Sequence, residues 1–395
     1  MKCYLMNKNK KIALIEYNTT LNAITEIHET LNFEYAPLLL SSHQGNSNFN
    51  MLKEMNNWFK NRGIPNWRKD LEKLLKNLNI QSPEELLDKA YGLSLSDQYW
   101  INPLEQSLEW KNINFFTNNF EYKAFLTASI LESNTKEKIS FMTPNNSTDG
   151  MLQKAWIIEN GKRKLVKGTY HITNQEPLNE WLASNICRRL GFDYCNYNID
   201  VIQGKIVSKC ECFINENEEI ITANDILGSE KKNNNTSYYQ HYINILEKHG
   251  IEKAKEDFEN MLLLDYIVMN YDRHTRNYGI IRNVETLKWE KLTPIFDTGE
   301  AMQNDQTILQ MNFNRGTGKF FSNTQKDFKD YLPIITNITR FDVSKLDGIV
   351  EEWNQQLVKY QDFTGMENER IEKLTKGLQY RIDLLRQYIN KIKTK

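Results

Sequence analysis

The chain has 395 residues, which is enough for two or three domains with hydrophobic cores of their own. Its 40% of hydrophobic and 11% of aromatic residues exclude a disordered chain and are typical of a globular protein. With 50 basic and 51 acidic side chains the net charge is −1. This balance argues against a dedicated nucleic-acid-binding protein, because such proteins carry a clear excess of positive charge.

Compartment and membrane topology are predicted from what the sequence lacks. No stretch approaches the roughly 18 uninterrupted apolar residues of a membrane-spanning helix, and residues 1–17 contain no apolar core of a secretory signal. The cysteines form no Cys-x-x-Cys pair, and Cys210 and Cys212 have no histidine nearby to complete a zinc site. We therefore expect reduced core thiols in a cytoplasmic protein with no membrane partner.

The first part of the chain reads as short strands followed by helices. Period-2 segments predict strands at 3–6, 11–17 and 23–31. Apolar residues at helical spacing then predict helices at 48–63, 67–80 and 82–92, the last with a Ser cap and a Pro in its first turn. We expect a small α+β N-terminal module over residues 1–115.

The rest of the chain changes from strand-rich to helix-rich. Strands are predicted at 138–143, 154–160, 162–170 and 198–213, with one long helix at 175–191 that has Pro177 in its first turn and Gly191 after its end. Further helices are predicted at 237–250, 252–271 and 368–393. A β-rich part followed by a larger α-rich part predicts an α+β, two-lobed, protein-kinase-like fold, with the small lobe at 116–215 and the large lobe at 216–395.

The stretch "MLLLDYIVMNYDRHTRNYGII" carries the strongest chemical signal. Asp272 directly follows a predicted buried helix, and Asn277 comes five residues after Asp272. Protein kinases place a proton-accepting Asp and a magnesium-binding Asn at this spacing because one tight loop then fixes both groups. In "TPIFDTGEAM", Asp297 follows a short hydrophobic strand and precedes Thr-Gly, as a metal-binding carboxylate would. We interpret Asp265, inside the helix, as a structural hydrogen-bonding carboxylate.

Two upstream features fit the same chemistry. Lys167 lies on a predicted strand, and Glu180 lies on the following helix on one strip with Ala183 and Cys187, whose small side chains would let it approach a sheet. Such a Lys–Glu pair orients a lysine toward phosphate groups. Before that strand, "PNNSTDG" at 144–150 is a polar turn that could cover phosphates. Each feature alone is also typical of a surface residue or an ordinary turn, and only their order and spacing favour the kinase.

The segments "NYDRHTRNYGIIRN" and "LTPIFDTG" resemble the Asp-x-His-x-x-Asn loop and the following Asp segment of HipA-like kinases, bacterial serine/threonine kinases distantly akin to phosphatidylinositol kinases. "VKG" and "QEPLNEWLASNICRRLG" are similar to the family's lysine strand and "NE" helix. The resemblance covers roughly 140–370 and implies ATP and Mg²⁺ as cofactors. It departs from the family at the phosphate loop, which reads "TDGMLQK" here.

The resemblance implies a role for each matching residue. Asp272 would be the catalytic base, with Lys167 and its partner Glu180 completing the catalytic set, and Asn277 and Asp297 would bind magnesium. The residues implied to contact ATP are Ser147, Thr148, Gly150, Lys154, Lys167, Glu211, Phe213 and His274, with 208–214 as the hinge under adenine. Ser147 and Thr148 stand where the family is autophosphorylated. The resemblance further implies a protein substrate such as a translation component, an antitoxin partner and toxin-like growth regulation.

Two other functions fit parts of the sequence. The Asp-Arg-His loop also suits a lipid or small-molecule kinase, although the chain has no strongly basic surface segment apart from its tail, which we expect to be an amphipathic helix packed on the large lobe. A nucleotide-binding pseudokinase acting through its N-terminal module is the second alternative. There, Lys60, Arg62, Arg68 and Lys69 lie near Trp58 and Trp67. We interpret this segment as a helical pair with core tryptophans and solvated charges, and expect no direct nucleic-acid binding.

Overall fold

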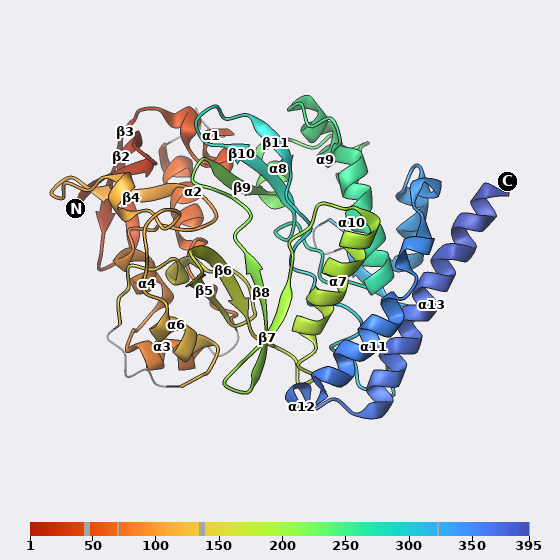
Figure 1. Cartoon of the computed structure of the whole chain (residues 1–395). Helices are drawn as coiled ribbons and strands as arrows, with labels where there is room; N and C mark the ends of the chain where they lie inside the picture. Colours follow the sequence, from red (N-terminus) through yellow and green to blue (C-terminus); the bar gives the residue numbers. More distant parts are fainter. Residues whose placement is uncertain (43–47, 69–70, 134–138, 322–323, 395) are drawn as a thin grey trace. The chain divides into compact units, whose positions relative to one another are not determined.

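A computed structural model describes residues 1–42, 48–68, 71–133, 139–321 and 324–394 of the chain (Figure 1). The chain divides into two compact units, each made of three separate stretches. Unit 1 comprises Met1–Lys167, Glu211–Asn235 and Ile280–Glu290, and unit 2 comprises Gly168–Cys210, Thr236–Gly279 and Lys291–Lys395. The predicted domain boundaries at 115/116 and 215/216 stay a prediction.

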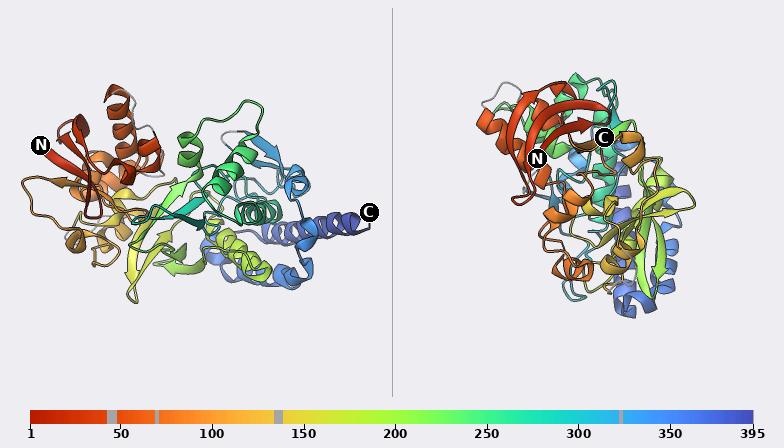
Figure 2. Two further views of the ribbon diagram at one scale, coloured as in Figure 1. Left: turned by 90° about the horizontal axis from the view of Figure 1, so that it is seen from above. Right: turned by 90° about the vertical axis from the view of Figure 1, so that its left-hand side faces the viewer.

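Unit 1 begins with a four-stranded antiparallel sheet in the order β3-β2-β1-β4, which faces the viewer on the right of Figure 2. Its strands are β1 (Lys2–Asn7), β2 (Lys10–Asn18), β3 (Ala23–Thr30) and β4 (Tyr99–Pro103). Alternate side chains such as Leu5 and Ile15 are fully buried, as the period-2 pattern predicts. They pack against Met55 and Phe59 of a neighbouring helix in one hydrophobic cluster.

Short helices follow the first three strands of unit 1. They are α1 (Leu38–Ser42), α2 (Asn48–Lys60), α3 (Leu71–Leu78), α4 (Pro83–Lys89), α5 (Trp110–Ile113) and α6 (Lys123–Ser129), with η1 (Phe33–Tyr35). The three helices predicted at 48–63, 67–80 and 82–92 correspond to α2, α3 and α4, so these predictions are confirmed. Ser82 caps α4 as expected, because its side chain accepts a hydrogen bond from the Glu85 amide at 3.3 Å.

The later part of unit 1 contains a hairpin and a small sheet. The hairpin pairs β5 (Lys154–Glu159) with β6 (Lys162–Lys167), and the three-stranded sheet has the order β11-β10-β9. The bounds of this sheet and its neighbouring helix are β9 (Glu218–Thr222), β10 (Gly279–Asn283), β11 (Trp289–Leu292) and α8 (Ala223–Ser229). Between α6 and the hairpin, the described residues form one short helical turn, η2 (Pro144–Ser147).

The predicted strand at 138–143 is wrong. Residue 138 lies outside the described residues, and 139–143 form no strand. Ile139 and Phe141 instead pack against a cluster of helix side chains, where the Phe141 ring lies 6.5 Å from that of Phe125. The alternating apolar side chains of 139–143 are therefore partly buried against helices, and these residues pair with no strand.

Unit 2 is mainly helical. Its helices are α7 (Glu176–Leu190), α9 (Tyr238–Lys248), α10 (Ala254–Val268), α11 (Ile349–Lys359), α12 (Gln361–Thr364) and α13 (Asn368–Lys393). Helix α7 packs against α10 and α11, and both of these helices pack against α13, as the green and blue helices of Figure 1 show. Gly191 ends α7 in the left-handed conformation, with φ 77°, as its position after the apolar pattern predicts.

The remaining elements of unit 2 are short. They are the hairpin of β7 (Asn198–Ile202) and β8 (Lys205–Glu211), the hairpin of β12 (Thr317–Lys319) and β13 (Gln325–Asp327), and the turns η3 (Phe328–Asp330), η4 (Leu332–Ile334), η5 (Ile338–Arg340) and η6 (Val343–Leu346). Glu211, the last residue of β8, belongs to unit 1.

The basic C-terminal helix α13 is amphipathic, and the expectation that it packs on the helical part is confirmed. Its buried residues recur every three or four positions, from Leu374 and Leu378 to Ile382, Leu385 and Ile389. This stripe lies against α10 and α11.

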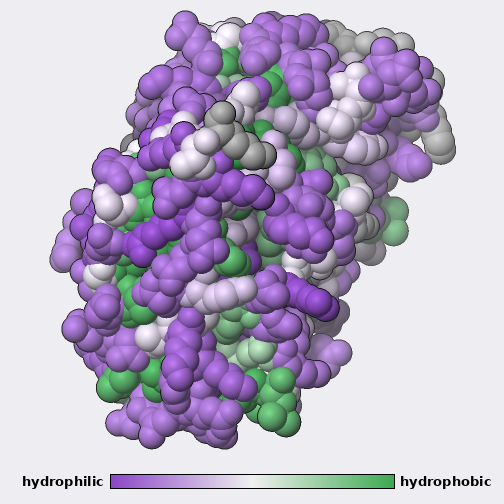
Figure 3. Space-filling view, turned by 90° about the vertical axis from the view of Figure 1, so that its right-hand side faces the viewer, coloured by the Kyte–Doolittle hydropathy of each residue, from purple (hydrophilic) through white to green (hydrophobic). Residues whose placement is uncertain are grey.

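The face of the molecule on the right of Figure 1 is mostly hydrophilic, with scattered hydrophobic side chains (Figure 3). Among the described residues, no helix has both the length and the apolar character to cross a bilayer.

Candidate active site

The apolar helix α10 is buried on nearly all sides, and its polar Asp265 anchors the loop that follows. The Asp265 side chain has no exposed surface and accepts hydrogen bonds from Arg273 Nε and Nη2, each at 2.9 Å. Asn270 Nδ2 donates to the same carboxylate at 2.9 Å. Met269, in the left-handed conformation with φ 52°, ends the helix. The prediction that Asp265 is a structural hydrogen-bonding carboxylate is confirmed.

Arg273 also joins the loop to the segment before Asp297. Its Nη1 donates to the carbonyl oxygens of Asn277 at 3.0 Å and of Phe296 at 2.6 Å. The guanidinium therefore holds three parts of unit 2 together, namely α10, the loop and the end of the hydrophobic segment 294–296. A planar group with five donors is suited to this role, because it makes several hydrogen bonds in fixed directions.

The loop fixes Asp272 and Asn277 relative to each other. The carbonyl of Asp272 accepts from the amide of His274 at 2.7 Å and from Asn277 Nδ2 at 3.1 Å, and the amide of Asn277 donates to the His274 carbonyl at 2.9 Å. Because the side-chain nitrogen of Asn277 is engaged in the loop, its Oδ1 is the atom suited to a cation. An amide nitrogen cannot ligate a metal, whereas an amide oxygen can.

His274 follows Asp272 in the loop, and its ring faces the Asp272 carboxylate. Burial lowers the pKa of the His274 imidazole, and the charges of Asp272 and Asp297 offset this only in part, so the ring is neutral at pH 7. Its Nδ1 accepts a hydrogen bond from the Arg276 amide at 3.2 Å. We infer from this bond that the proton is on Nε2, which lies 3.8 Å from Asp272 Oδ2. His274 therefore presents a donor toward Asp272.

Asp297 has an unusual backbone conformation. Its φ is 55°, in the left-handed region that a non-glycine residue seldom adopts. Its amide donates to the Tyr197 hydroxyl at 3.2 Å. The residue before Asp297, Phe296, is tied to the loop of Asp272 and Asn277 by the hydrogen bond from Arg273. Strained backbone of this kind is concentrated at functional sites.

Lys319 completes this group and was not predicted from the sequence. Its Nζ forms an ion pair with Asp272 Oδ1, and its amide donates to the Tyr271 carbonyl at 3.0 Å. The lysine ends β12, and Gly318 lets this strand approach the loop, because an added Cβ would lie 2.9 Å from the Asn270 carbonyl oxygen. Sequence spacing offers no signal for this lysine beyond the glycine before it.

Lys167 and Glu180 lie in different units, so their pairing stays a prediction. Lys167 is buried at the end of β6 in unit 1. Glu180 is fully buried on α7 in unit 2, where Ser208 of β8 donates a hydrogen bond to its carboxylate. The expectation that Glu180 can approach a sheet strand beside Ala183 and Cys187 is confirmed by this contact.

The predicted phosphate loop lies in unit 1, and both of its candidate hydroxyls are engaged. The Ser147 hydroxyl donates to the Leu93 carbonyl at 2.9 Å. The buried Thr148 hydroxyl donates to the Asn145 carbonyl at 3.1 Å and accepts from Arg68 Nη1 at 2.8 Å. Lys154 Nζ donates to the Asp149 carbonyl at 2.9 Å and lies close to Gly150, which has φ 100°. The loop is thus a closed turn held by hydrogen bonds.

Glu211 and Phe213, the remaining nucleotide candidates, also lie in unit 1. Glu211 is exposed and forms an ion pair with Lys162 at 2.9 Å, and Phe213 is half-buried.

The interpretation of the segment at 58–69 as solvated charges beside core tryptophans needs correction. Arg68 is 4% exposed and Trp67 is 58% exposed, because the turn before α3 directs the arginine toward Ser129 and Thr148. Lys69 lies outside the described residues.

The chain is similar to one curated protein and to two solved structures. A serine/threonine-protein kinase, CtkA of Helicobacter pylori strain J99, is 26% identical over 162 residues, which are 38% of this chain and 50% of that protein. The chain thus spans about half the length of this curated relative. A crystal structure of the H. pylori proinflammatory kinase CtkA is 18% identical, with a TM-score of 0.46, and the match covers 61% of this chain and 95% of that one.

A second solved structure shows the fold. It is the complex of HipA, HipB and operator DNA from the toxin–antitoxin system of Shewanella oneidensis MR-1, with a TM-score of 0.53 and 14% identity over 100% of this chain and 99% of that one. The predicted fold class, an α+β kinase-like fold of two lobes, is confirmed. The family model of the HipA-like C-terminal domain matches residues 137–361, which is more than half of the sequence. The chain therefore belongs to the HipA-like C-terminal domain family.

Proposed function

We propose that the chain is a Mg-ATP-dependent serine/threonine protein kinase of HipA type. The observation that carries the proposal is the loop that holds Asp272 and Asn277 together, which Arg273 joins to Phe296, the residue before Asp297. Family membership and the name of the curated relative support phosphoryl transfer to a protein hydroxyl. These residue types in this order match what the transfer needs, which is a proton acceptor, a metal-binding amide and a second metal-binding carboxylate.

The residues present fit a magnesium ion. Asn277 Oδ1 and the Asp297 carboxylate are hard oxygen ligands, and Mg²⁺ is usually held by one or two carboxylates together with water and substrate phosphates. The hydrogen bond from Asn277 Nδ2 to the Asp272 carbonyl occupies the amide nitrogen, so the amide oxygen of Asn277 is the proposed ligand atom. When bound, ATP supplies the γ-phosphoryl group and Mg²⁺ offsets the negative charge of its phosphates.

Asp272 is the proposed base. Its carboxylate orients the acceptor hydroxyl and takes up the proton that this hydroxyl loses, and its backbone is fixed by the loop hydrogen bonds to His274 and Asn277. Lys319 holds one carboxylate oxygen of Asp272 in place through the ion pair. The neutral His274 donates from Nε2 toward the second oxygen or toward a phosphate oxygen. Positioning of this kind is the main contribution of a protein to phosphoryl transfer.

The nucleotide contacts are proposed from Lys167 and the phosphate loop of unit 1 and from the segment 208–214, which begins in unit 2 and continues in unit 1. Lys167, paired with Glu180, contacts the non-transferred phosphates, and Lys154 and Gly150 lie beside them in the phosphate loop. The backbone of 208–214, including Glu211 and Phe213, lies under the adenine. These roles follow from the family pattern and from the burial of Lys167 and Lys154, because a buried lysine in a kinase small lobe is suited to a charged ligand.

Autophosphorylation at Ser147 or Thr148 is proposed to accompany opening of the phosphate loop. Each hydroxyl donates to a backbone carbonyl, and Thr148 is buried, so a hydroxyl must leave these contacts before it can accept a phosphoryl group. The buried Arg68, 2.8 Å from the Thr148 hydroxyl, would lose its contact when the loop moves. Phosphorylation would then keep the loop open.

The partner and the cellular role follow from the family alone. The solved HipA structure contains HipB and operator DNA, and we propose an antitoxin-type partner, a protein substrate and a toxin-like effect on growth in the cytoplasm. Affinity capture of the tagged Asp272→Asn variant from its own cells tests the partner. Recovery of a single stoichiometric DNA-binding protein is the expected result.

The proposed activity is tested with purified protein, labelled ATP and Mg²⁺, followed by mapping of the labelled sites. Label is expected on Ser147 or Thr148, or on a protein from a lysate, and is expected to disappear in Asp272→Ala and Asp297→Ala. Asp362→Asn, which changes an exposed carboxylate on α12, is the control that should keep the label. An Asp297→Ala variant labelled as strongly as the wild type would overturn the proposal.

A further inference from the structure

A second group of ionisable side chains lies in unit 2 and has no part in the proposed transfer. His171, Glu176 and Glu300 each offer one ligand atom, and these three atoms lie within 4.8 Å of one another. Glu176 is the first residue of α7, His171 lies on the segment before that helix, and Glu300 follows the Asp297 segment. Three stretches of the chain therefore meet at this cluster.

The cluster is buried and built by specific contacts. Glu176 is 1% exposed, and one of its carboxylate oxygens accepts from the amides of Tyr170 at 2.9 Å and of His171 at 2.7 Å. Glu300 is 9% exposed and contacts His171 Nε2 through Oε2 at 2.9 Å, and Tyr271 donates its hydroxyl to the same oxygen. Gly299 allows the close approach, because an added Cβ would lie 3.2 Å from Glu176 Cβ.

Three buried oxygen atoms in or beside this cluster have no hydrogen-bond donor among the described residues. Glu176 Oε2, Glu300 Oε1 and the nearby Asn304 Oδ1 are all buried and without a partner among the described residues. Asn304 is fully buried and donates from Nδ2 to Glu300 Oε2 at 3.2 Å, so its side chain faces the cluster. A buried carboxylate oxygen without a hydrogen-bond donor is destabilising, because it loses its contacts with water and gains nothing in return.

The charges in the cluster do not balance. Two carboxyl groups face one imidazole, so a protonated His171 can neutralise at most one of them. The imidazole contacts Glu300 Oε2, whereas the unpaired oxygens are Glu176 Oε2 and Glu300 Oε1. A small cation among these oxygens would supply the missing charge and the missing partners together.

We propose that His171, Glu176 and Glu300 bind a divalent transition-metal cation of the Zn²⁺ or Mn²⁺ type. One imidazole nitrogen and two carboxylate oxygens favour these ions, since Mg²⁺ and Ca²⁺ prefer oxygen ligands alone. The bound cation ties the segment before α7 to the segment 299–304. The inference does not depend on the proposed kinase activity, because it uses none of Asp272, Asn277 and Asp297.

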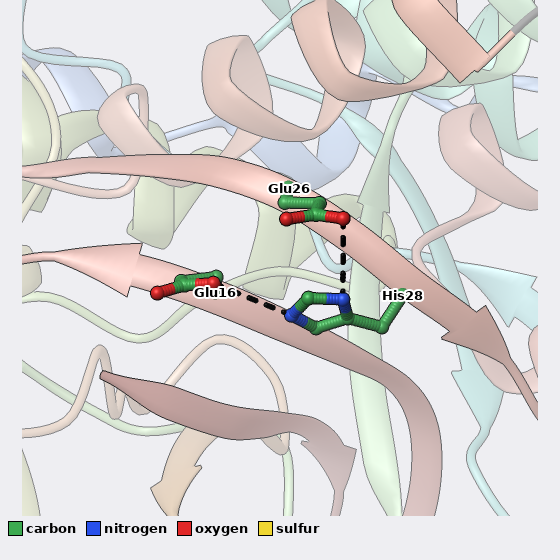
Figure 4. Close-up of side chains that lie close together, drawn as sticks. All are labelled: Glu16, Glu26 and His28. Atoms are coloured by element: carbon green, nitrogen blue, oxygen red, sulfur yellow. Dashed lines mark ion pairs between the residues drawn. The ribbon is translucent and has the colours of Figure 1, made fainter.

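A second cluster of the same composition serves as an internal control. Glu16, Glu26 and His28 lie on β2 and β3 of unit 1, as Figure 4 shows. Here each ring nitrogen of His28 already faces a carboxylate, at 3.4 Å from Glu16 and 3.3 Å from Glu26. Glu26 and His28 are exposed, Glu16 is half-buried, and among the described residues no buried oxygen without a partner belongs to this cluster, so we infer no metal site there.

The test is a titration of the full-length, EDTA-treated protein with Zn²⁺ by calorimetry and with Mn²⁺ by electron paramagnetic resonance. The wild type is expected to bind one ion saturably. Glu176→Gln and Glu300→Gln should each weaken binding at least about tenfold. Gln at 176 keeps a side-chain oxygen for the Tyr170 and His171 amides, and circular dichroism verifies that both variants fold.

Two further variants separate this site from others. Glu16→Gln/Glu26→Gln should bind like the wild type, and so should Asp297→Asn, because neither change touches the buried cluster. The metal is also expected to raise the unfolding temperature of the wild type and not that of Glu176→Gln. The proposal is overturned if the wild type shows no saturable binding, or if Glu176→Gln binds as the wild type does. An Asp297→Asn variant that alone loses the ion would place the metal at the proposed active site and would equally overturn it.

Discussion

Lys319 and Asp272, 47 residues apart in the sequence, form an ion pair between β12 and the loop after α10. The lysine side chain is 33% exposed and that of Asp272 is 13% exposed, so the pair lies at an accessible edge of unit 2. The Lys319 amide is also bonded to the Tyr271 carbonyl at 3.0 Å. Backbone and side chain of the lysine therefore both fix the position of the proposed base.

Removing the Lys319 side chain should lower the rate of phosphoryl transfer by about 10²-fold, because an incorrectly placed catalytic group costs about that factor. We expect Lys319→Ala to leave the KM for ATP within a few-fold and Lys319→Arg to retain part of the rate. Lys326→Ala, on the paired strand β13, is the matched control and should behave like the wild type. The measurement is initial rates of label transfer. Higher transfer by Lys319→Ala would mean that the lysine covers Asp272 in a resting enzyme.

Gly318→Ala should reproduce this loss without removing any charge. An added Cβ would lie 2.8 Å from the Tyr331 hydroxyl oxygen and 2.9 Å from the Asn270 carbonyl oxygen, so β12 must move away from the loop. We expect the transfer rate to fall and the Lys319 position to shift. Gly63→Ala is the control, because its Cβ would meet the nearest atom at 3.5 Å. Equal rates for Gly318→Ala and the wild type would contradict a positioning role for β12.

Local sequence signals predict helices such as α7 and the loop that carries Asp272 and Asn277. They do not predict Lys319, whose place in the site depends on contacts between distant parts of the chain. Pro177 and Gly191 mark the ends of α7 in the sequence because they act through their own backbone. Asp272 and Asn277 were found together because one loop carries both. Lys319 was missed because its contacts with Asp272 and with the Tyr271 carbonyl join distant stretches of the chain, which no spacing rule connects.

The buried cluster of His171, Glu176 and Glu300 was missed for the same reason. Glu176 reads as an ordinary acidic residue in the first turn of a helix, where it is favoured by the helix dipole. Only the contact with the segment after Asp297, made possible by Gly299, reveals that a second carboxylate faces it. Arg68 illustrates the opposite error, since a basic residue beside a tryptophan was taken as solvated and proved to be buried.

Arg273→Met should destabilise the protein strongly. The Arg273 side chain is 3% exposed and that of Asp265 is fully buried, so the change leaves an uncompensated buried charge. The expected loss in the free energy of unfolding is about 3–5 kcal/mol. It is measured by urea unfolding.

The control is Arg386→Met, which breaks an ion pair with Asp347 whose side chains are 35% and 67% exposed. Its expected cost is at most about 1 kcal/mol. Adding Asp265→Asn to Arg273→Met removes the isolated charge and should recover part of the loss. Equal stability of Arg273→Met and Arg386→Met would contradict the anchoring role of the buried pair.

Asp88 in unit 1 should make stability depend on pH. Burial raises the pKa of the Asp88 carboxyl to about 6, and the hydrogen bond donated by Tyr17 lowers it in part. The folded state therefore holds this proton more tightly than the unfolded chain does. The contribution of Asp88 is most favourable below its ordinary pKa of about 4, falls as the pH rises to about 6 and is constant above that.

Asp88→Asn removes this titration, so the variant should gain stability relative to the wild type between about pH 4 and pH 6. The gain is about 1 kcal/mol once solvent screening of this half-buried group is allowed for. Tyr17→Phe removes the donor that lowers the pKa of Asp88, so its pH-dependent range should extend to higher pH. Urea unfolding at several pH values measures both differences. A difference between Asp88→Asn and the wild type that is the same at pH 4 and pH 7 would mean that the Asp88 proton is held equally in the folded and unfolded states.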